Sequence, residues 1–373
     1  MPQVNPDSIS FYADSADAAS MEHIDYNDFV KLPESGERMQ GFSPAYRDIV
    51  DYILRITHEI WEERGVGRIY DTYHNDTIVH SCSRTKVGIQ SVVAGTLSHL
   101  HAFPDKKCVA EAVIWAEDSP SYYFSSHRSS GLATNLGDSE FGKRTGKHVH
   151  FRAIADCAVH DNRIYEEWLV RDNLSLVRQL GLDPWELAAE MNRREAGGGR
   201  PASTLKSSYG KNESMEGQFY PERYMAKDDS VSEMLAQMYQ NVYSCKMINE
   251  IRDFYHPNAK VNYIDDKILC GYEEIQGCVI SFLASFPNAF HTLDRITVNR
   301  MADGTTEAAV RWRLRGLHEG IGMFGAPTGK PVEIMGISHY RITDGKISEA
   351  WILYDGFDVL RQILAEDAPQ EPI

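Results

Sequence analysis

The sequence predicts an α+β protein that contains two copies of one domain. The stretch RIYEEWLVRDNLSLVRQLG, which begins at Arg163, recurs as KISEAWILYDGFDVLRQIL from Lys346, with the Ile, Glu, Trp, Asp and Arg-Gln positions retained. In each half of the chain a helical pattern of apolar residues comes first, and short strand-like runs follow it. Helices followed by strands are typical of an α+β domain with an antiparallel sheet.

The repeat extends well beyond this one stretch. At the same offset of 183 residues, Gly88 matches Gly271, Phe103-Pro104 matches Phe286-Pro287, and Thr145-Gly146-Lys147 matches Thr328-Gly329-Lys330. Units of repeat architectures are about 20 to 50 residues long, so a period of this length indicates a duplicated domain.

Each half begins with a predicted helix and continues with predicted strands. Apolar residues recur three and four positions apart at Ile49, Ile53, Ile56 and Ile60, and again at Met234, Leu235, Met238, Val242 and Cys245. This spacing places them on one helix face. The strand-like runs are rich in β-branched and aromatic residues; they are CVAEAVIWA and SYYFSSH in the first half, and AAVRWRL and EIMGISHYRI in the second.

Turn-forming residues set the expected domain boundaries. The stretch from Arg194, REAGGGRPASTLKSSYGKNESMEG, is rich in Gly, Ser and Pro and is typical of a linker. We therefore expect five segments: an N-terminal arm (1–42), a first domain (43–190), a Gly/Ser-rich linker (191–229), a second domain (230–366) and a C-terminal tail (367–373).

The last two strands of each half are predicted to form a hairpin. In the second half the turn is Thr343-Asp344-Gly345, and in the first half it is His160-Asp161-Asn162. A three-residue connection with Gly or Asn in the left-handed position suits both turns. In that register Asp172 faces His150, and Asp355 faces Glu333.

Ionisable and aromatic residues share one face of each predicted hairpin, because side chains alternate along a strand. The first-half face holds His148, His150, Arg152, Ile154, Asp156, Glu166, Trp168, Val170 and Asp172. A face of this kind suits a ligand cavity, since unpaired charges are costly in a packed core. It could equally be solvated or buried in a subunit interface, with the other face meeting the helices.

Composition excludes several classes of function. The net charge of −16 argues against nucleic acid and anionic membrane as partners, because both require clustered Lys and Arg. No apolar run reaches the roughly 20 residues of a membrane span, and the acidic N-terminus is unlike a signal peptide. The six cysteines lack C-x-x-C spacing, which indicates neither disulfides nor a thiolate zinc site. We expect a cytoplasmic protein.

The motifs of the second half resemble those of a known family. They are Arg311-Trp312, Gly316 to Gly320 (GLHEG), Ala326 to Lys330 (APTGK), the YRI-x-DGKI stretch from Tyr340, and the E-x-W-x-x-x-D stretch from Glu349 to Asp355. In this order they are similar to the SnoaL-like polyketide cyclases of the NTF2-like superfamily. The resemblance covers both halves.

This resemblance implies two cone-shaped domains, each a curved antiparallel sheet with helices around a pocket, commonly paired as dimers through the sheets. It also implies a cofactor-free acid–base site built on an Asp in the last strand and a His sixteen residues earlier. Those positions hold Asp355 and His339 in the second half. In the first half they hold Asp172 and Asp156, so a carboxylate replaces the imidazole.

The first half offers its own candidate acid–base set. Asp172 opposite His150 would be a carboxylate–imidazole pair, which raises the basicity of the imidazole. Arg152 could bind a substrate carboxylate or an enolate, and Asp156 could be the second proton-transfer group. The alternative is a ladder of ion pairs on the protein surface. Glu333 opposite Asp355 would raise one carboxyl pKa by repulsion.

Further residues are candidate substrate contacts: His80, His127, Arg128, His148, Trp168, Glu333, Trp351 and His318. A metal site at His148 and His150, completed by His127 or His80 with Asp172, is an alternative, although two His one residue apart in a strand are more often only polar neighbours. We interpret His99 and His101 as structural residues near a helix end.

The sequence thus predicts a cofactor-independent lyase, isomerase or cyclase that acts on a small polar organic substrate by proton transfer. One half could be catalytic and the other supporting, because the two candidate sets differ. A non-catalytic ligand-binding or assembly module remains the alternative class of function. Fusion of two copies also suggests that the halves pack together as an intramolecular pseudo-dimer, and a homodimer of the whole chain is a further possibility.

Overall fold

The computed structural model describes residues 39–82, 84–197, 224–226 and 230–365. Most of the predicted N-terminal arm and linker, and the whole predicted C-terminal tail, lie outside these residues. We call residues 39–197 the first half and residues 224–365 the second half. Within these residues, no helix combines the length and the apolar character that a membrane span requires.

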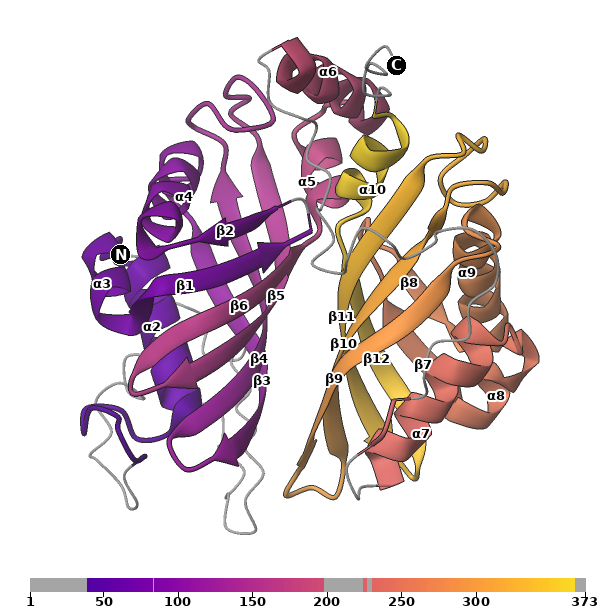
Figure 1. Ribbon diagram of the computed structural model, residues 1–373, viewed down its shortest axis with the longest axis horizontal. Helices are drawn as coiled ribbons and strands as arrows, with labels where there is room; N and C mark the ends of the chain where they lie inside the picture. Colours follow the sequence, from indigo (N-terminus) through magenta and orange to yellow (C-terminus); the bar gives the residue numbers. More distant parts are fainter. Residues whose placement is uncertain (1–38, 83, 198–223, 227–229, 366–373) are drawn as a thin grey trace, which may run out of the picture.

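The first half contains helices at both ends and a sheet between them (Figure 1). Its helices are α2 (Ile49–Trp61), α3 (Ile69–Thr72), α4 (Ile89–Ala102), α5 (Asn173–Gln179) and α6 (Pro184–Gly197), with a 3₁₀ turn at Val66–Arg68. Its strands are β1 (Tyr73–Ser81), β2 (Thr85–Val87), β3 (Lys107–Ser119), β4 (Tyr122–Thr134), β5 (His148–His160) and β6 (Arg163–Arg171).

The second half repeats this order of elements. Its helices are α7 (Ser230–Met238), α8 (Ile251–Phe254), α9 (Gly271–Ser285) and α10 (Gly356–Ile363), with a π-helical turn at Tyr239–Ser244 and a 3₁₀ turn at Ile248–Glu250. Its strands are β7 (Tyr255–Asn262), β8 (Ile268–Cys270), β9 (Phe290–Arg300), β10 (Thr306–Leu317), β11 (Pro331–Thr343) and β12 (Lys346–Tyr354).

The predicted helices and strands are confirmed. Helix α2 begins after Asp48, whose carboxylate accepts a hydrogen bond from the Asp51 backbone N–H, as an N-cap residue does. The isoleucines at its predicted spacing are all buried, namely Ile49, Ile53, Ile56 and Ile60. One boundary differs from the prediction, because α6 continues to Gly197, inside the segment expected to be linker.

Each half contains one six-stranded sheet, in the orders β2-β1-β6-β5-β4-β3 and β8-β7-β12-β11-β10-β9. The strands β3 to β6 and β9 to β12 pair antiparallel, as predicted, but β1 pairs parallel with β6 and β7 pairs parallel with β12. Each sheet is therefore mixed, and neither closes into a barrel.

The predicted hairpin register is wrong by two residues. Both connections are two-residue turns, Asp161-Asn162 and Asp344-Gly345, and both residues of each have positive φ angles, as a type I′ turn requires. A bulge follows in each hairpin. Asp156 consequently pairs with Trp168, and the Asp172 backbone N–H reaches the Arg152 carbonyl instead of facing His150.

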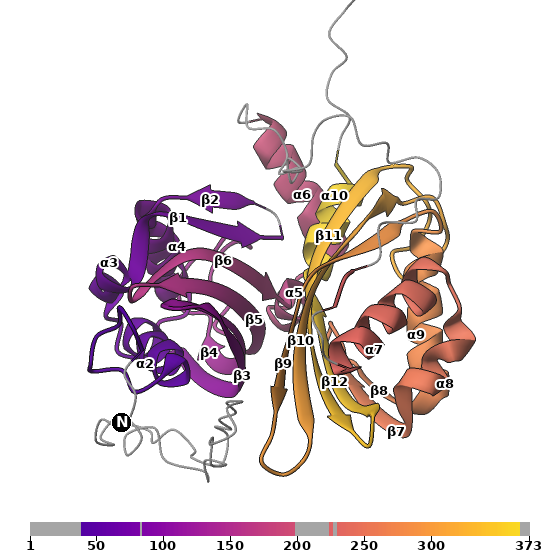
Figure 2. The same ribbon diagram turned by 60° about the horizontal axis from the view of Figure 1, so that its bottom comes forward.

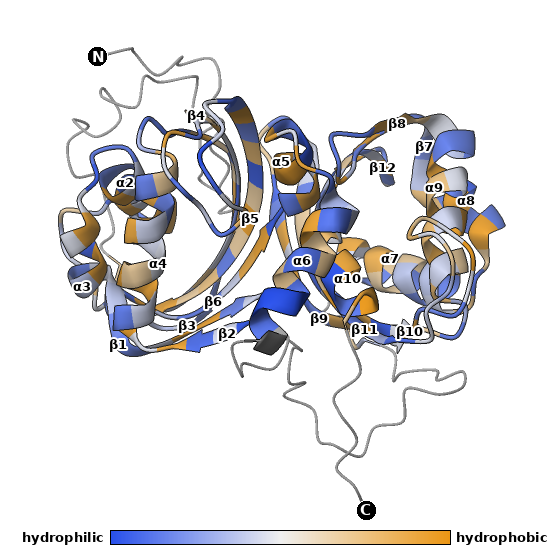
Figure 3. Cartoon of the chain, turned by 90° about the horizontal axis from the view of Figure 1, so that it is seen from above, coloured by the Kyte–Doolittle hydropathy of each residue, from blue (hydrophilic) through white to orange (hydrophobic). Residues whose placement is uncertain are grey.

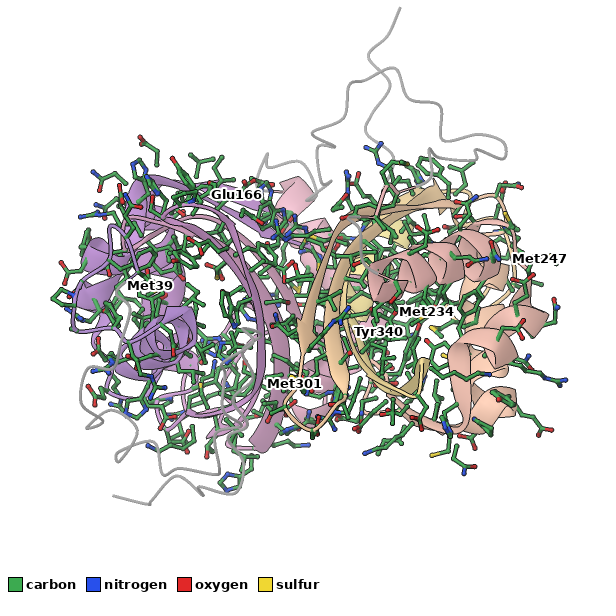
Figure 4. The ribbon with its side chains drawn as sticks, turned by 90° about the horizontal axis from the view of Figure 1, so that it is seen from below. Met39, Glu166, Met234, Met247, Met301 and Tyr340 are labelled. Carbon is green, nitrogen blue, oxygen red and sulfur yellow. The ribbon has the colours of Figure 1, made fainter. Side chains whose placement is uncertain are left out.

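The two sheets lie side by side in the middle of the molecule, with α2, α3 and α4 on one outer side and α7, α8 and α9 on the other, while α5, α6 and α10 lie near the top of Figure 1, between the halves (Figures 1 and 2). Helices α2 and α4 cover the concave side of the first sheet, as Figure 3 shows, and α7 and α9 cover that of the second. Tyr340 and Met234, labelled in Figure 4, lie on this helix side of the second sheet. The convex faces meet at the junction between the halves.

The junction has an approximate two-fold relation. The guanidinium of Arg128 lies 3.5 Å from the ring centre of Trp351, and that of Arg311 lies 3.6 Å from the ring centre of Trp168. Arg128 and Arg311 are 183 positions apart, as are Trp168 and Trp351, so each contact is the repeat of the other. The two-fold relation does not extend to the partners of these arginines. Arg311 binds the Asp156 carboxylate at 2.9 Å, whereas Arg128 binds the His339 ring at 3.3 Å.

Candidate functional site

A cavity of about 340 Å³ lies between the sheet and the helices of the first half. Helices α2 and α4 form one wall, and strands β1, β4, β5 and β6 form the other. The lining residues of β4 and β5 have odd numbers, such as Ala153 and Ala155, and so do those of β6 beyond its bulge, such as Glu167 and Arg171. The volume suits a small organic molecule.

The equivalent cavity of the second half measures only about 20 Å³. Its lining is dominated by large aromatic residues, which are Tyr239, Tyr243, Tyr255, Tyr263, Phe282, Trp312 and Tyr354. Trp312 reaches this space beside Gly336, where a Cβ atom would lie 2.1 Å from the indole ring. This space can hold a water molecule at most, whereas the equivalent space of the first half has room for a ligand.

Comparison of the two halves at the offset of 183 identifies what changed. Seven polar residues of the first cavity have apolar or aromatic counterparts in the second half: Lys86 and Leu269, His99 and Phe282, Lys106 and Ala289, His127 and Val310, Ser129 and Trp312, Glu167 and Ala350, and Arg171 and Tyr354. Large side chains fill the second space, and these seven polar residues have no polar counterpart of the same charge there, although His291 lines it. The first cavity is therefore the candidate functional site.

Glu167 is the buried carboxyl group of this cavity, with 7% of its surface exposed. Strand β6 presents it to the concave side, where it accepts a hydrogen bond of 3.0 Å from the Tyr73 hydroxyl. Burial raises the pKa of Glu167, while the Tyr73 hydrogen bond and the charge of Arg171 oppose the shift. Such a carboxylate is a stronger base than an exposed one.

Lys106 and His99 form a second polar group in the cavity. The Lys106 ammonium lies 3.4 Å from Nε2 of His99 and 4.3 Å from the ring centre of Trp61. Burial, and then the charge of Lys106, lowers the pKa of His99 well below its ordinary value. Burial also lowers the pKa of Lys106. A neutral imidazole beside a partly desolvated ammonium can supply a hydrogen bond and positive charge to a substrate oxygen.

His127 lines the same cavity from β4 and is 6% exposed. Burial lowers its pKa to about 4, so the ring is neutral at pH 7. Its Nε2 atom is buried and has no hydrogen-bond partner among the described residues. His127, predicted as a substrate contact, thus lines the cavity, and its ring nitrogen is available to a ligand.

The predicted catalytic face of the first half does not line this cavity, so the expectation that it would is wrong. Its residues have even numbers and lie on the convex side. Asp156 binds Arg311 of the second half, and Arg152 contacts Asp172 and the Tyr263 carbonyl at 2.7 Å. The alternative interpretations were a surface ladder of ion pairs and a face buried in a subunit interface; the structure places these ion pairs at the junction between the two halves of one chain.

His150 and Asp172 are not partners of each other. The backbone of His150 bonds to the Gln179 side chain at 2.7 and 3.0 Å. Asp172 is the N-cap of α5, accepting a hydrogen bond from the Ser175 N–H, and it also accepts one from the Asp265 N–H of the second half. Burial raises the pKa of Asp172. Its contacts hold a helix start and the junction.

The candidate residues of the second half are also outside the first cavity. His339 accepts or donates a hydrogen bond at 2.8 Å with the Ser126 hydroxyl across the junction, and Asp355 is the N-cap of α10. Glu333 pairs with Arg315 at 3.2 Å. His318 is fully buried and contacts the Thr328 hydroxyl at 3.2 Å.

The remaining candidates lie at the junction or at the surface. His80 binds Glu166 at 2.8 Å and stacks on Trp168, which lies on the convex side with Arg128 and Trp351. Figure 4 labels Glu166 at the edge of the first half. His148 is exposed and contacts the Thr134 hydroxyl at 2.9 Å. The described residues contain no group of three or more His, Cys, Asp or Glu arranged to hold a metal ion.

Sequence reasoning missed Glu167, Arg171, Lys106 and His99. Glu167 and Arg171 lie on the strand that carries Trp168, on its other face, and His99 was interpreted as structural. The sequence did contain a signal, because each of these polar residues corresponds to an apolar or aromatic residue at the equivalent position of the other half. When equivalent positions are ionisable in one copy and apolar in the other, the copy with the ionisable residues is the one expected to retain a polar pocket.

Comparison with known proteins gives the following results. The model of the family described as SnoaL-like polyketide cyclase matches residues 52–180 and 233–363, one match in each half. A comparison with curated proteins finds no significant match.

Solved structures similar to this chain resemble one half at a time. IdmH from Streptomyces antibioticus is 24% identical over 36% of this chain and 99% of its own, with a TM-score of 0.31. TsrD from Streptomyces laurentii is 18% identical over 38% of this chain and 100% of its own, with a TM-score of 0.32. A SnoaL-like polyketide cyclase from Agrobacterium tumefaciens is 17% identical over 36% of this chain and 98% of its own, with a TM-score of 0.29.

Proposed function

Because the chain belongs to the SnoaL-like polyketide cyclase family, whose name denotes cyclase-type enzymes, we propose that its first half is the catalytic domain. The reaction is a proton-transfer reaction of the cyclase, isomerase or lyase type on a small polar organic substrate bound in the first cavity. Side chains of the cavity carry it without a cofactor. The second half supports the first, and its equivalent cavity is filled, with only about 20 Å³ left open.

Glu167 is the proposed general base. Its carboxylate takes a proton from a carbon next to a substrate carbonyl, and the two electrons of the C–H bond pass to the carbonyl oxygen as an enolate. Burial favours this transfer because it destabilises the charged carboxylate that the proton neutralises. Tyr73 orients the carboxylate through its hydrogen bond of 3.0 Å.

Lys106 and His99 are the proposed stabilisers of the enolate. The ammonium of Lys106 supplies positive charge in a site that Trp61 partly shields from water, where electrostatic interactions are stronger than in bulk water. The enolate carbon then attacks a second carbonyl, or takes back a proton at another position, and the proton held by Glu167 completes the product. A positioned base contributes about 10² to 10⁴-fold to such a step.

One observation carries this proposal. The cavity that remains open is the one that keeps Glu167, His99, Lys106 and His127, while Ala350, Phe282, Ala289 and Val310 occupy the same places beside the filled one. If the polar groups served only packing, there would be no reason for their loss to accompany the loss of the space. The association supports catalysis in the first half.

The junction between the halves suggests a role for the second half. The paired Arg–Trp contacts at the junction suggest that the two halves associate as the subunits of a dimer would, within one chain. The junction supports β5 and β6 from their convex side, and these strands carry Ala153, Glu167 and Arg171 on their concave side. We propose that the second half keeps the curvature of this sheet, and with it the volume of the cavity.

The proposal can be tested by deuterium exchange. Dimethyl 3-oxoglutarate has acidic CH₂ groups beside carbonyl groups, and its exchange with D₂O can be followed by NMR. We expect the protein to accelerate the exchange, and Glu167→Gln to lower the acceleration by about 10²-fold or more. Ser129→Trp, which places in the first cavity the residue that fills the second, should abolish it.

Glu166→Gln is the matched control, because Glu166 is the next residue of β6 and binds His80 on the convex side. It should leave the exchange unchanged. If Glu166→Gln and Glu167→Gln are equally active, or if Ser129→Trp retains full activity while folded, the first cavity is not the active site.

A further inference from the structure

A second space of about 400 Å³ adjoins the first cavity where the two halves meet. Six residues line both spaces, which are Ser81, Lys86, Glu140, Leu169, Arg171 and Asn173. Helices α6 and α10, which pack against each other near the top of Figure 1, supply the far wall through Met191, Glu195 and Arg361. We call this space the vestibule, since it continues the first cavity toward the solvent.

The vestibule is lined by more cations than anions. The cations are Arg84, Lys86, Arg171, Arg194 and Arg361, and the carboxyl groups are Glu140, Glu195 and Asp355. In a chain with a net charge of −16, a local excess of positive charge is unusual. Such an excess in a concave, partly enclosed space attracts anionic ligands.

Three of the five cations are already paired. Arg84 and Arg361 both bind the carboxylate of Glu195, at 2.6 and 2.9 Å, and Arg194 binds Glu190 on α6. These pairs fix the far wall. Glu190 compensates the charge of Arg194, and Glu195 compensates one of the two charges of Arg84 and Arg361.

Lys86 and Arg171 remain at the boundary between the cavity and the vestibule. Within the part of the chain that the structure describes, neither side chain has a hydrogen bond or an ion pair. Arg171 is half-buried, so its unpaired guanidinium is held partly away from water. Its counterpart beside the filled cavity is Tyr354, and that of Lys86 is Leu269. Both charges are therefore absent from the half that has no room for a ligand.

We propose that Arg171 and Lys86 form an anion-binding site at the mouth of the first cavity, and that the substrate carries a carboxylate or a phosphate group there. The body of the ligand, with its reacting carbonyl group, enters the cavity, and its anionic end stays at the boundary. This proposal rests on the proposed function and adds the charge class of the substrate. A guanidinium offers two parallel N–H donors to a carboxylate or a phosphate.

The second half completes this site. Asp355, the N-cap of α10, accepts a hydrogen bond of 2.6 Å from Asn173, which follows Arg171 by two residues and lines both spaces. Arg361 lies on the opposite wall. A ligand that reaches through the mouth thus meets residues of both halves, so the fused second domain takes part in ligand entry.

The test compares ligands of one shape and different charge on the full chain. 2-Naphthoate carries a carboxylate, 2-naphthyl phosphate carries a phosphate, and 2-naphthamide is neutral. Binding is measured by calorimetry at low and high salt. We expect at least one anion to bind about 10-fold more tightly than the amide, with the preference reduced by salt, as charge screening requires. The better anion identifies the group.

Arg171→Met and Lys86→Met should each remove most of this preference and leave amide binding unchanged. Arg193→Met is the matched control, because Arg193 is exposed on α6 and does not line the vestibule. It makes the same change in net charge, and should keep the preference. Arg171→Lys should restore part of it.

Several results would overturn the proposal: no binding of either anion, equal binding of anions and amide, or an anion preference that survives Arg171→Met. If the anions and the amide bind equally and Ser129→Trp abolishes their binding, the anion site is rejected and the first cavity remains the ligand site. Loss of deuterium exchange activity with a retained anion preference would reject the catalytic role alone. The two proposals can thus fail separately.

Discussion

Replacement of Arg311 by Met is the sharpest test of the junction. The guanidinium of Arg311 binds the Asp156 carboxylate at 2.9 Å, and both residues are nearly inaccessible to solvent, at 7% and 1% exposed. Arg311→Met keeps a long apolar side chain but leaves a buried carboxylate without its cation from the other half. The matched variant is Arg128→Met, at the equivalent position of the first half.

The two variants differ in what remains behind. Both lose a stacked Arg–Trp contact, which cancels in the comparison. Loss of one partner from a buried ion pair costs about 3 to 5 kcal/mol. Arg128→Met leaves the His339 ring without this partner. Burial, and then the charge of Arg128, lowers the pKa of His339 well below its ordinary value, so the ring is neutral. The loss of a hydrogen bond to a neutral group costs about 1 kcal/mol. The other partner of Arg128, Glu111, has a side chain that is 32% exposed and can be rehydrated.

We therefore expect Arg311→Met to lower the free energy of unfolding by about 2 to 3 kcal/mol more than Arg128→Met. Urea denaturation at pH 7, followed by circular dichroism, measures this difference. The double variant Asp156→Asn with Arg311→Met should recover much of the loss, since no charge stays buried. Burial also raises the pKa of Asp156, so acidification should narrow the gap between the two single variants. Equal losses in both, or a gap that acid does not change, would refute the reasoning.

Three further predictions concern the pockets and pH. Gly336→Ala places a Cβ atom 2.1 Å from the Trp312 ring and should lower stability by about 1 to 3 kcal/mol in thermal unfolding; an unchanged melting temperature would contradict this packing. Burial, and then a neighbouring carboxylate, raises the pKa of Asp355, so the folded state binds its proton more tightly than the unfolded state does. Stability should fall as the pH rises above the ordinary carboxyl range, and Asp355→Asn should flatten this dependence in melting curves recorded from pH 4 to 8; an unaltered slope would argue against it. Tyr73→Phe removes a hydrogen bond that lowers the pKa of Glu167, so the acid limb of the deuterium exchange profile should move to higher pH, and a shift to lower pH would contradict the assigned base.

The duplication and most elements were predictable because they depend on local pattern. The spacing of Ile49, Ile53, Ile56 and Ile60 is sufficient for one helix face, and it defines the buried side of α2. The alternation along β6 likewise shows correctly that Trp168 and Asp172 share a side. These inferences need only the periods of helices and strands.

The face that lines the cavity was not predictable from one strand pattern, because both faces of β5 and β6 mix polar and apolar residues. Asp156 finds its counter-charge on Arg311, 155 residues away in sequence, and only the docking of the two sheets brings them together. Charged residues on a strand indicate a ligand cavity or a junction equally well. The register was missed for a local reason, since Asp161 and Asn162 both adopt positive φ angles and shorten the turn.

The covalent link between the copies allows one position of a two-fold interface to hold two different residues. Asp156 and His339 occupy such a position, 183 residues apart. In a symmetric dimer of separate chains one gene would encode both, and any mutation that filled one pocket would fill its twin. Under the function proposed above, one active site in the first half serves the whole chain. Ligand titrations should therefore saturate at one equivalent per chain, and saturation curves should show no cooperativity between the two halves.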